Sequence, residues 1–266
     1  MGWKTLLTIG ISTILISGCS EINSLLNKLP FTADDSGKNQ QSQEDVTPND
    51  DPLSLESIFF NDIKEVDGKN VIQNSTNVMA LVNKEFYLPE DYTPEDLVRP
   101  DVTFSFGEVE IEKSLMRKEA AEALEKMFTA AANNGIELYA ISGYRSYSRQ
   151  KTLFEAEVNR VGIEKAAEAV AIPGASEHQS GLAMDISSKS NKFYLNEAFA
   201  DTTEGKWLKD NAHRFGFILR YPKEKIDITN YMYEPWHFRY VGIKPATIMY
   251  EHNWTLEEYF NEVKKM

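Results

Sequence analysis

The sequence is short of several residue types, and each shortage narrows the kind of protein it can encode. Among 266 residues there is one cysteine, Cys19, so no internal disulfide can form and a cysteine-rich metal site is excluded. Any metal must therefore be bound by His, Asp or Glu. Only 28 basic residues stand against 41 acidic ones, giving a formal charge of -13. Because proteins bind phosphate backbones through clustered Lys and Arg, nucleic acid is not expected as a partner.

The apolar run near the N-terminus is shorter than a typical transmembrane helix. The apolar residues 5–16 fall short of the about 20 that a membrane-spanning helix needs. A charged start, this short run and small residues before Cys19 are typical of a secretory signal, which we expect at residues 1–18. The sequence Ile16-Ser17-Gly18-Cys19 resembles the bacterial lipobox, which implies lipidation of Cys19 and cleavage before it. The alternative is an ordinary signal peptide with a chance cysteine.

Residues 19–57 are expected to form a lipid anchor and a disordered acidic tether. From Thr32 to Glu56 the chain is rich in Asp, Ser, Gln, Asn and Pro, and Lys38 is its single basic residue. Such a segment buries too little apolar surface to offset its chain entropy. We expect it to hold the folded part away from a membrane, whereas the alternative is a charged loop packed on the domain.

Residues 58–266 are expected to form one domain, because no repeat or internal linker interrupts them. Apolar spacing predicts helices over residues 114–134, 147–159 and 207–215. Strands are predicted over residues 136–142, 182–187, 217–221 and 228–240. Helices and strands without regular alternation indicate the α+β class, with a small, mainly antiparallel sheet and flanking helices.

Side chains that can take part in catalysis or metal binding are concentrated in three segments. They are Ser142-Gly-Tyr-Arg-Ser146, Ser176-Glu-His-Gln-Ser-Gly-Leu-Ala-Met-Asp185 and Glu234-Pro-Trp-His-Phe238. The segments resemble the signatures of the zinc D-Ala-D-Ala carboxypeptidases and dipeptidases, which include vancomycin-resistance enzymes, and of the related L,D-carboxypeptidases. The likeness runs from about residue 78 to residue 242.

The resemblance implies a catalytic zinc ion bound by His178, Asp185 and His237. Three protein ligands with one position left for water are typical of catalytic zinc, and imidazole and carboxylate groups suit it. The chain contains only four histidines, so two of them in motif positions carry weight. His213 and His252 are expected to be ordinary structural or surface residues.

The resemblance also implies the catalytic groups. Glu234 is the candidate general base, and Arg145 is the candidate cation that steadies the polarised carbonyl oxygen. Their alternatives are an ordinary salt bridge and a surface arginine. Residues three apart on a regular strand face opposite sides, so Glu234 and His237 cannot both reach one metal from an undistorted strand. Pro235 is expected to mark a bend there.

Five further residues match positions that line the substrate pocket in the L,D-carboxypeptidase branch. The resemblance assigns substrate binding to Ser142, Gln150, Ser176, Tyr221 and Trp236. For Ser142 the alternative is a cap at a strand end, and for Trp236 it is packing in the core.

The expected function is zinc-dependent removal of the terminal D-alanine from peptidoglycan stem peptides, at an L,D- or a D,D-bond. The pocket residues favour the L,D-bond. The enzyme is expected to be a monomer, anchored by lipid to the membrane outside the cytoplasm. One alternative is a peptidoglycan endopeptidase with the same metal site; others are a non-catalytic cell-wall-binding lipoprotein and a solute-binding lipoprotein. Serine penicillin-binding chemistry is excluded, because the chain has no Ser-x-x-Lys leading to a Lys-Thr-Gly element.

Overall fold

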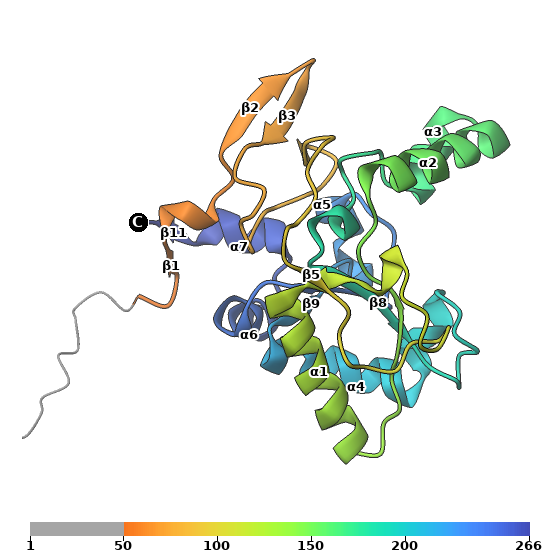
Figure 1. The fold of residues 1–266 in the computed structure, drawn as a ribbon. Coiled ribbons are helices and arrows are strands. Elements are labelled where there is room, and N and C mark those ends of the chain that lie inside the picture. Colours follow the sequence, from red (N-terminus) through yellow and green to blue (C-terminus); the bar gives the residue numbers. More distant parts are fainter. Residues whose placement is uncertain (1–50) are drawn as a thin grey trace, which may run out of the picture. The chain divides into compact units, whose positions relative to one another are not determined.

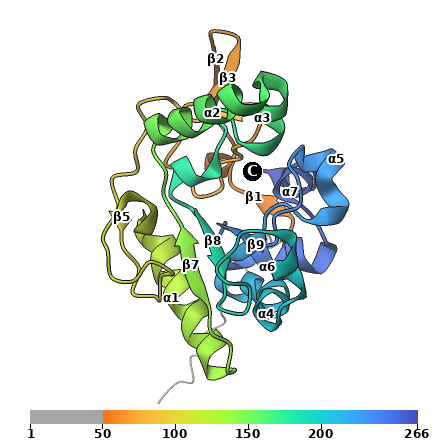
Figure 2. The same cartoon turned by 90° about the vertical axis from the view of Figure 1, so that its right-hand side faces the viewer.

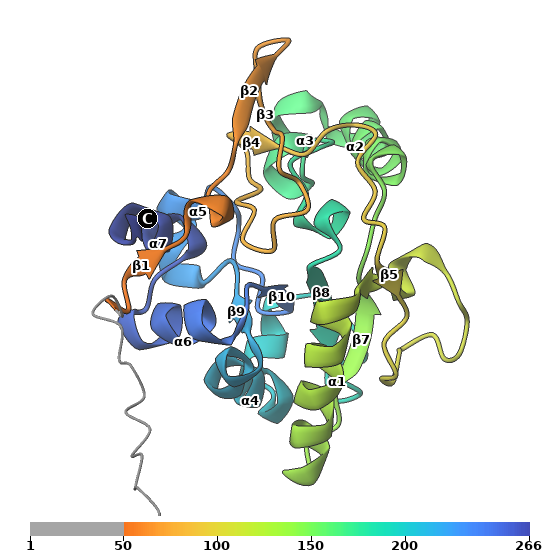
Figure 3. The ribbon, with the colours of Figure 1, turned by 60° about the vertical axis from the view of Figure 1, so that its left-hand side comes forward.

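A four-stranded antiparallel sheet carries the chemically capable segments at or beside the ends of its strands. The computed structural model describes residues 51–266, which belong to one unit of the chain. In spatial order the strands are β7 (Tyr139–Ser142), β8 (Ala183–Ser187), β10 (His237–Tyr240) and β9 (Phe217–Leu219). Figure 3 shows β8 and β10 between the two outer strands. Asp185 pairs with His237 across β8 and β10, so two candidate metal ligands lie on adjacent strands.

The two faces of strand β8 carry different kinds of residue: apolar side chains on one face and the candidate metal ligand Asp185 on the other. Leu182, Met184 and Ile186 are fully buried in the main apolar cluster, as the alternation predicted. Asp185 points to the other face, yet it is only 4% exposed. Because strands cover both edges of β8 and other segments cover both faces, all five of its residues are buried.

Helix α1 (Lys118–Asn133) packs on this core through one apolar face. The predicted helix began at residue 114, but Met116–Arg117 forms strand β6, which pairs with β5 (Leu97–Val98). Gly135 has a φ of 72°, so the predicted left-handed residue after the helix is confirmed. The buried positions of α1 follow the predicted three- and four-residue spacing: Ala120, Ala121, Leu124, Met127 and Ala131.

The other helices are distributed around the sheet (Figures 1 and 2). Helices α2 and α3 pack against each other, and α6 packs against β9. The predicted helix over 147–159 is confirmed as α2, and that over 207–215 as α4 followed by a 3₁₀ turn. The α-helices are α2 (Tyr147–Val161), α3 (Ile163–Ala169), α4 (Thr203–Asn211), α5 (Ile226–Thr229), α6 (Ile243–His252) and α7 (Leu256–Glu262). Short 3₁₀ helices span Ser57–Phe59, Glu112–Ser114, Glu177–Ser180, Glu197–Asp201, Ala212–Phe215 and Lys223–Lys225.

Besides the β5–β6 pair, two further small sheets lie outside the central one. Strands β2 (Ile63–Val66), β3 (Lys69–Ile72) and β4 (Phe86–Tyr87) form the first. The second pairs β1 (Ser54–Leu55) with β11 (Lys264–Lys265) in parallel. Leu55 is buried in an apolar cluster with residues of α6 and α7. Residues 53–57, which the sequence assigned to the tether, therefore belong to the folded unit.

The predicted strand over residues 228–240 is wrong in its first part. Helix α5 ends at Thr229 and is capped by Asn230, which adopts a left-handed conformation with a φ of 58°. A turn follows, in which the backbone N–H of His237 donates to the carbonyl oxygen of Glu234 at 3.1 Å. The strand begins only at His237, after the expected bend at Pro235.

The expected fold class is confirmed: mixed helices and strands surround a small antiparallel sheet. Within residues 51–266, every helix is too short or too polar to cross a lipid bilayer. The expected signal peptide, Cys19 and most of the tether lie outside the described residues.

Candidate active site

A cavity of about 750 Å³ opens beside the ends of β8 and β10. Its wall includes residues of α2, the segment 175–178 and the turn before β10. Of the ten residues that the sequence assigned to catalysis, metal binding or substrate binding, all but Ser142 line this cavity. They are Arg145, Gln150, Ser176, His178, Asp185, Tyr221, Glu234, Trp236 and His237.

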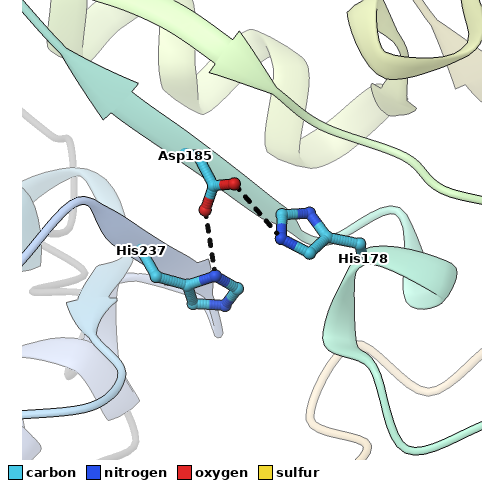
Figure 4. Close-up of side chains that lie close together, drawn as sticks. All are labelled: His178, Asp185 and His237. Carbon is cyan, nitrogen blue, oxygen red and sulfur yellow. Dashed lines mark hydrogen bonds and ion pairs between the residues drawn. The ribbon is translucent and has the colours of Figure 1, made fainter. Parts of the chain in front are cut away.

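Three of these side chains converge from separate elements, as Figure 4 shows. His178 comes from the short helix Glu177–Ser180, Asp185 from β8 and His237 from the first position of β10. One carboxylate oxygen of Asp185 lies 3.1 Å from Nδ1 of His237, and the other lies 3.4 Å from Nε2 of His178. All three side chains are buried.

The two histidines present different ring nitrogens to Asp185. Nδ1 of His178 lies 2.8 Å from the carbonyl oxygen of Gly143 and donates to it, which leaves Nε2 facing the carboxylate. Burial lowers the pKa of His178 to about 3, although Asp185 opposes this shift, so the ring is neutral. His237 faces Asp185 through Nδ1, while its Nε2 lies 3.2 Å from Oε2 of Glu177.

His237 lies between two carboxylates. Burial disfavours its charge, but its hydrogen bonds to Asp185 and Glu177 outweigh burial and raise its pKa to about 9. The excess of negative charge around this ring makes the position favourable for a cation.

This donor set fits a zinc ion. The three groups offer one ligand atom each, and these atoms lie within 4.8 Å of one another. Two imidazole nitrogens and one carboxylate oxygen match the three-ligand arrangement of catalytic zinc sites. The second ring nitrogen of each histidine is held by an oxygen acceptor, as is usual for metal-ligating histidines.

Glu234 lies next to the three candidate ligands without forming a close ion pair. Its Oε2 is 3.8 Å from Nδ1 of His237, and its side chain is 27% exposed to the cavity. Burial raises the pKa of Glu234 to about 7, an effect that His237 reduces and Asp185 increases. A carboxyl group with this pKa can both take up and release a proton near neutral pH.

Arg145 extends into the cavity from the turn between β7 and α2. Its Nη1 donates to Oε1 of Gln150 at 2.9 Å, and its Nη2 lies 3.4 Å from Oγ of Ser142. Burial lowers its pKa from the usual value, while Asp185 and Glu234 oppose that effect. Two of the residues expected to bind substrate thus hold the candidate catalytic arginine.

The other expected pocket residues form different parts of the cavity wall. Tyr221 stacks on Tyr231, with ring centroids 4.6 Å apart, and its ring lies 5.0 Å from that of His237. Ser176 is buried beside His178. Trp236 lines the cavity and also packs against the main core, so it serves both of the roles considered for it.

His213 and His252 lie away from this site. His213 stacks on Tyr250, and His252 stacks on Trp254.

Sequence reasoning missed the residues behind His237. Glu177 stands inside the second motif, but no role was assigned to it. Its carboxylate is fully buried and contacts Arg220 and Arg239 as well as His237. An acidic residue directly before a motif histidine is a sequence signal for a role at the site, whereas nothing near Arg220 or Arg239 in the sequence indicates that Glu177 is their partner.

Comparison with known proteins identifies the protein family of this chain. The family model of D-alanyl-D-alanine carboxypeptidase (VanY) matches residues 113–243, which include every candidate site residue of the folded unit. YodJ of Bacillus subtilis (strain 168), a candidate carboxypeptidase, is 55% identical over 262 residues, covering 97% of this chain and 95% of YodJ.

Two solved structures extend this result to the fold. The LdcB LD-carboxypeptidase is 62% identical with a TM-score of 0.79, and the match covers 80% of this chain and 100% of LdcB. A vancomycin-resistance D,D-pentapeptidase of the VanY type, solved with Zn(II), is 35% identical with a TM-score of 0.57; that match covers 69% of this chain and 99% of the pentapeptidase.

The chain therefore belongs to the VanY family of D-alanyl-D-alanine carboxypeptidases. The family and the zinc carboxypeptidase class expected from the sequence are confirmed.

Proposed function

We propose that this protein removes the terminal D-alanine from peptidoglycan stem peptides, with His178, Asp185 and His237 as zinc ligands. The single observation that carries the proposal is the convergence of these ligands with Glu234 and Arg145 in one cavity. A bound zinc ion would polarise the scissile carbonyl and make a water molecule more acidic.

The protein's own side chains carry out proton transfer, stabilise the carbonyl oxygen and contact the substrate. Glu234 takes a proton from the attacking water and passes it to the nitrogen of the departing D-alanine, because its carboxylate lies beside the ligands. Arg145 donates to the carbonyl oxygen as negative charge develops on it. Gln150 and Ser142 hold the guanidinium in place, while Ser176, Tyr221 and Trp236 form substrate-contacting walls.

Among the possible bonds we favour the L,D-bond of a tetrapeptide stem. The identity is 62% to the LD-carboxypeptidase LdcB and 35% to the VanY-type D,D-pentapeptidase. The residue types at the five expected pocket positions support the same preference.

Incubation of the purified protein with defined tetrapeptide and pentapeptide muropeptides, followed by mass spectrometry, tests this proposal. We expect loss of one D-alanine from the tetrapeptide. Cleavage of the pentapeptide alone would indicate a D,D-carboxypeptidase. A crosslinked muropeptide dimer is added to the same assay, and its cleavage at the crosslink would identify an endopeptidase. If the zinc-loaded protein cleaves none of these substrates, the result would favour the non-catalytic binding role.

We further propose that the enzyme is a monomer that works outside the cytoplasm, attached to the membrane by lipid on Cys19 and separated from it by the acidic tether. The lipobox-like sequence before the sole cysteine supports the anchor. The location of the substrate in the cell wall supports the extracytoplasmic placement. The molar mass of the protein without its N-terminal 50 residues, measured by light scattering, would test whether it is a monomer.

A further inference from the structure

Glu177 connects a candidate zinc ligand to a buried group of charged residues. Its Oε2 lies 3.2 Å from Nε2 of His237, on the side of the ring opposite Asp185. Its Oε1 accepts from Nε of Arg220 at 2.7 Å and from Nη1 of Arg239 at 2.8 Å. The side chains of Glu177, Arg220 and Arg239 are all 0% exposed.

The two arginines determine the charge of Glu177. Both guanidinium groups donate to the same oxygen, Oε1, and two permanent positive charges at hydrogen-bond distance favour the ionised carboxylate. Each arginine is held in turn. Arg239 also donates to the backbone carbonyl oxygens of Val78 and Ala80, and Arg220 is bound by Glu257 of α7.

An ionised carboxylate accepts hydrogen bonds and cannot donate them. Nε2 of His237 must therefore carry its hydrogen when it contacts Glu177. In the neutral ring the lone pair is then on Nδ1, which is the atom that faces Asp185 and Glu234. The contact with Glu177, whose side chain is 0% exposed, therefore sets both the orientation and the tautomer of the His237 ring.

We propose that Glu177 is a positioning residue for zinc binding, acting through His237. The inference rests on the proposed zinc ligands and adds the reason why His237 offers Nδ1. Replacement of Glu177 by Gln would place an amide between two guanidinium groups and the imidazole. The amide has no charge to match the arginines, and its NH₂ group meets donors rather than acceptors.

Glu257 provides a matched comparison. It binds the same Arg220 through two hydrogen bonds, 2.8 Å from Nη1 and 2.6 Å from Nη2. Its hydrogen bonds go to Arg220 and Asn83, and none goes to His237. Glu257→Gln therefore removes one charge from the same group of residues while the contact between Glu177 and His237 stays intact.

The test measures zinc dissociation constants by competition with a chromophoric chelator, for the wild type and for Glu177→Gln, Glu257→Gln and Asp185→Ala. We expect Glu177→Gln to weaken zinc binding about 10- to 100-fold. Glu257→Gln should lower the melting temperature but keep the wild-type zinc affinity within about twofold. Proton–nitrogen NMR of histidine-labelled zinc protein should show a hydrogen on Nε2 of His237, strongly shifted downfield in the wild type.

The outcomes separate this inference from the function on which it rests. Wild-type zinc affinity in Glu177→Gln, with zinc lost from Asp185→Ala, would overturn the role of Glu177 and leave the ligands in place. Equal weakening in Glu257→Gln would also overturn it, because the effect would then come from the stability of the charged group. Stoichiometric zinc in Asp185→Ala would refute the ligand assignment itself. If Glu177→Gln does not fold, the NMR result on the wild type decides, and a hydrogen on Nδ1 of His237 would contradict the inference.

Discussion

Arg145 donates a hydrogen bond of 2.9 Å to the buried side chain of Gln150. Gln150 uses its other end to donate to the carbonyl oxygen of Ala171 at 2.7 Å, so its amide is fixed at both ends. A residue expected to contact substrate thus acts on a catalytic group. The candidate oxyanion-binding cation is preorganised before substrate arrives, which is the condition under which such a charge contributes most to catalysis.

Loss of this support should reduce turnover more than binding. In Gln150→Ala, Arg145 loses its fixed acceptor, and misplacement of a catalytic group by about 1 Å can cost up to about 10²-fold in rate. We expect kcat to fall about 10- to 100-fold with a smaller change in KM, measured by release of D-alanine from a muropeptide. Thr152→Ala, on the exposed side of the same helix, is the control and should keep the wild-type rate. An unchanged kcat in Gln150→Ala would contradict the preorganisation of Arg145.

Direct replacement of the cation should have a larger effect. Arg145→Lys keeps a positive charge but loses the forked contact to Gln150 and Ser142. Removal of one oxyanion-binding donor typically costs about 10²- to 10³-fold in kcat, and we expect a loss in this range. Zinc content should stay at the wild-type value, because Arg145 is not among the metal-binding groups. Zinc loss in Arg145→Lys would indicate that the arginine supports the metal site rather than the reaction.

Zinc removal should destabilise the folded unit. A ligand that binds only the native state stabilises it by about 2.7 kcal/mol at a free concentration 100 times its Kd. For a domain of this size that corresponds to a melting temperature higher by roughly 5 to 10 °C. We expect a chelator to lower the melting temperature by this amount in the wild type and to have no effect on Asp185→Ala. An equal response of both proteins would show that the chelator acts elsewhere.

Membrane attachment should depend on one residue. The sole cysteine follows a lipobox-like sequence, so metabolic labelling with a fatty-acid analogue should mark the wild type. Cys19→Ala should lose the label and appear in the soluble fraction, with its zinc-dependent activity intact. An unlabelled wild-type protein would refute lipidation.

The sequence predicted those parts of the fold that depend on local patterns. The three- and four-residue spacing of Ala120, Leu124 and Met127 located the inner face of α1, because such spacing follows from helix geometry alone. The candidate ligands His178, Asp185 and His237 were found because the motifs that contain them resemble those of zinc carboxypeptidases. In the structure, the ligand atoms of these three residues lie within 4.8 Å of one another.

Other features depend on contacts between distant segments. Residues around Tyr231 have strand-like composition, yet the Tyr231 ring stacks on Tyr221 and its hydroxyl donates to the carbonyl oxygen of Ala175. These tertiary contacts replace sheet pairing. The partners of Glu177 lie 43 and 62 positions away at Arg220 and Arg239, so no local pattern could link them.

The separation of proton transfer from metal binding gives the sharpest test of the mechanism. Glu234 lies three residues before His237, but the turn at Pro235 places its carboxylate at 3.8 Å from Nδ1 of that histidine, outside the group of metal-binding atoms. Glu234→Gln keeps the shape of the side chain and removes its basicity. Folding and zinc content should therefore persist, as judged by circular dichroism and elemental analysis. Turnover should fall by about 10²- to 10⁴-fold, which is typical for loss of a positioned general base. His213→Gln, which changes a histidine outside the cavity, is the matched control and should keep both zinc and turnover. Near-wild-type cleavage by zinc-loaded Glu234→Gln would show that another group transfers the proton.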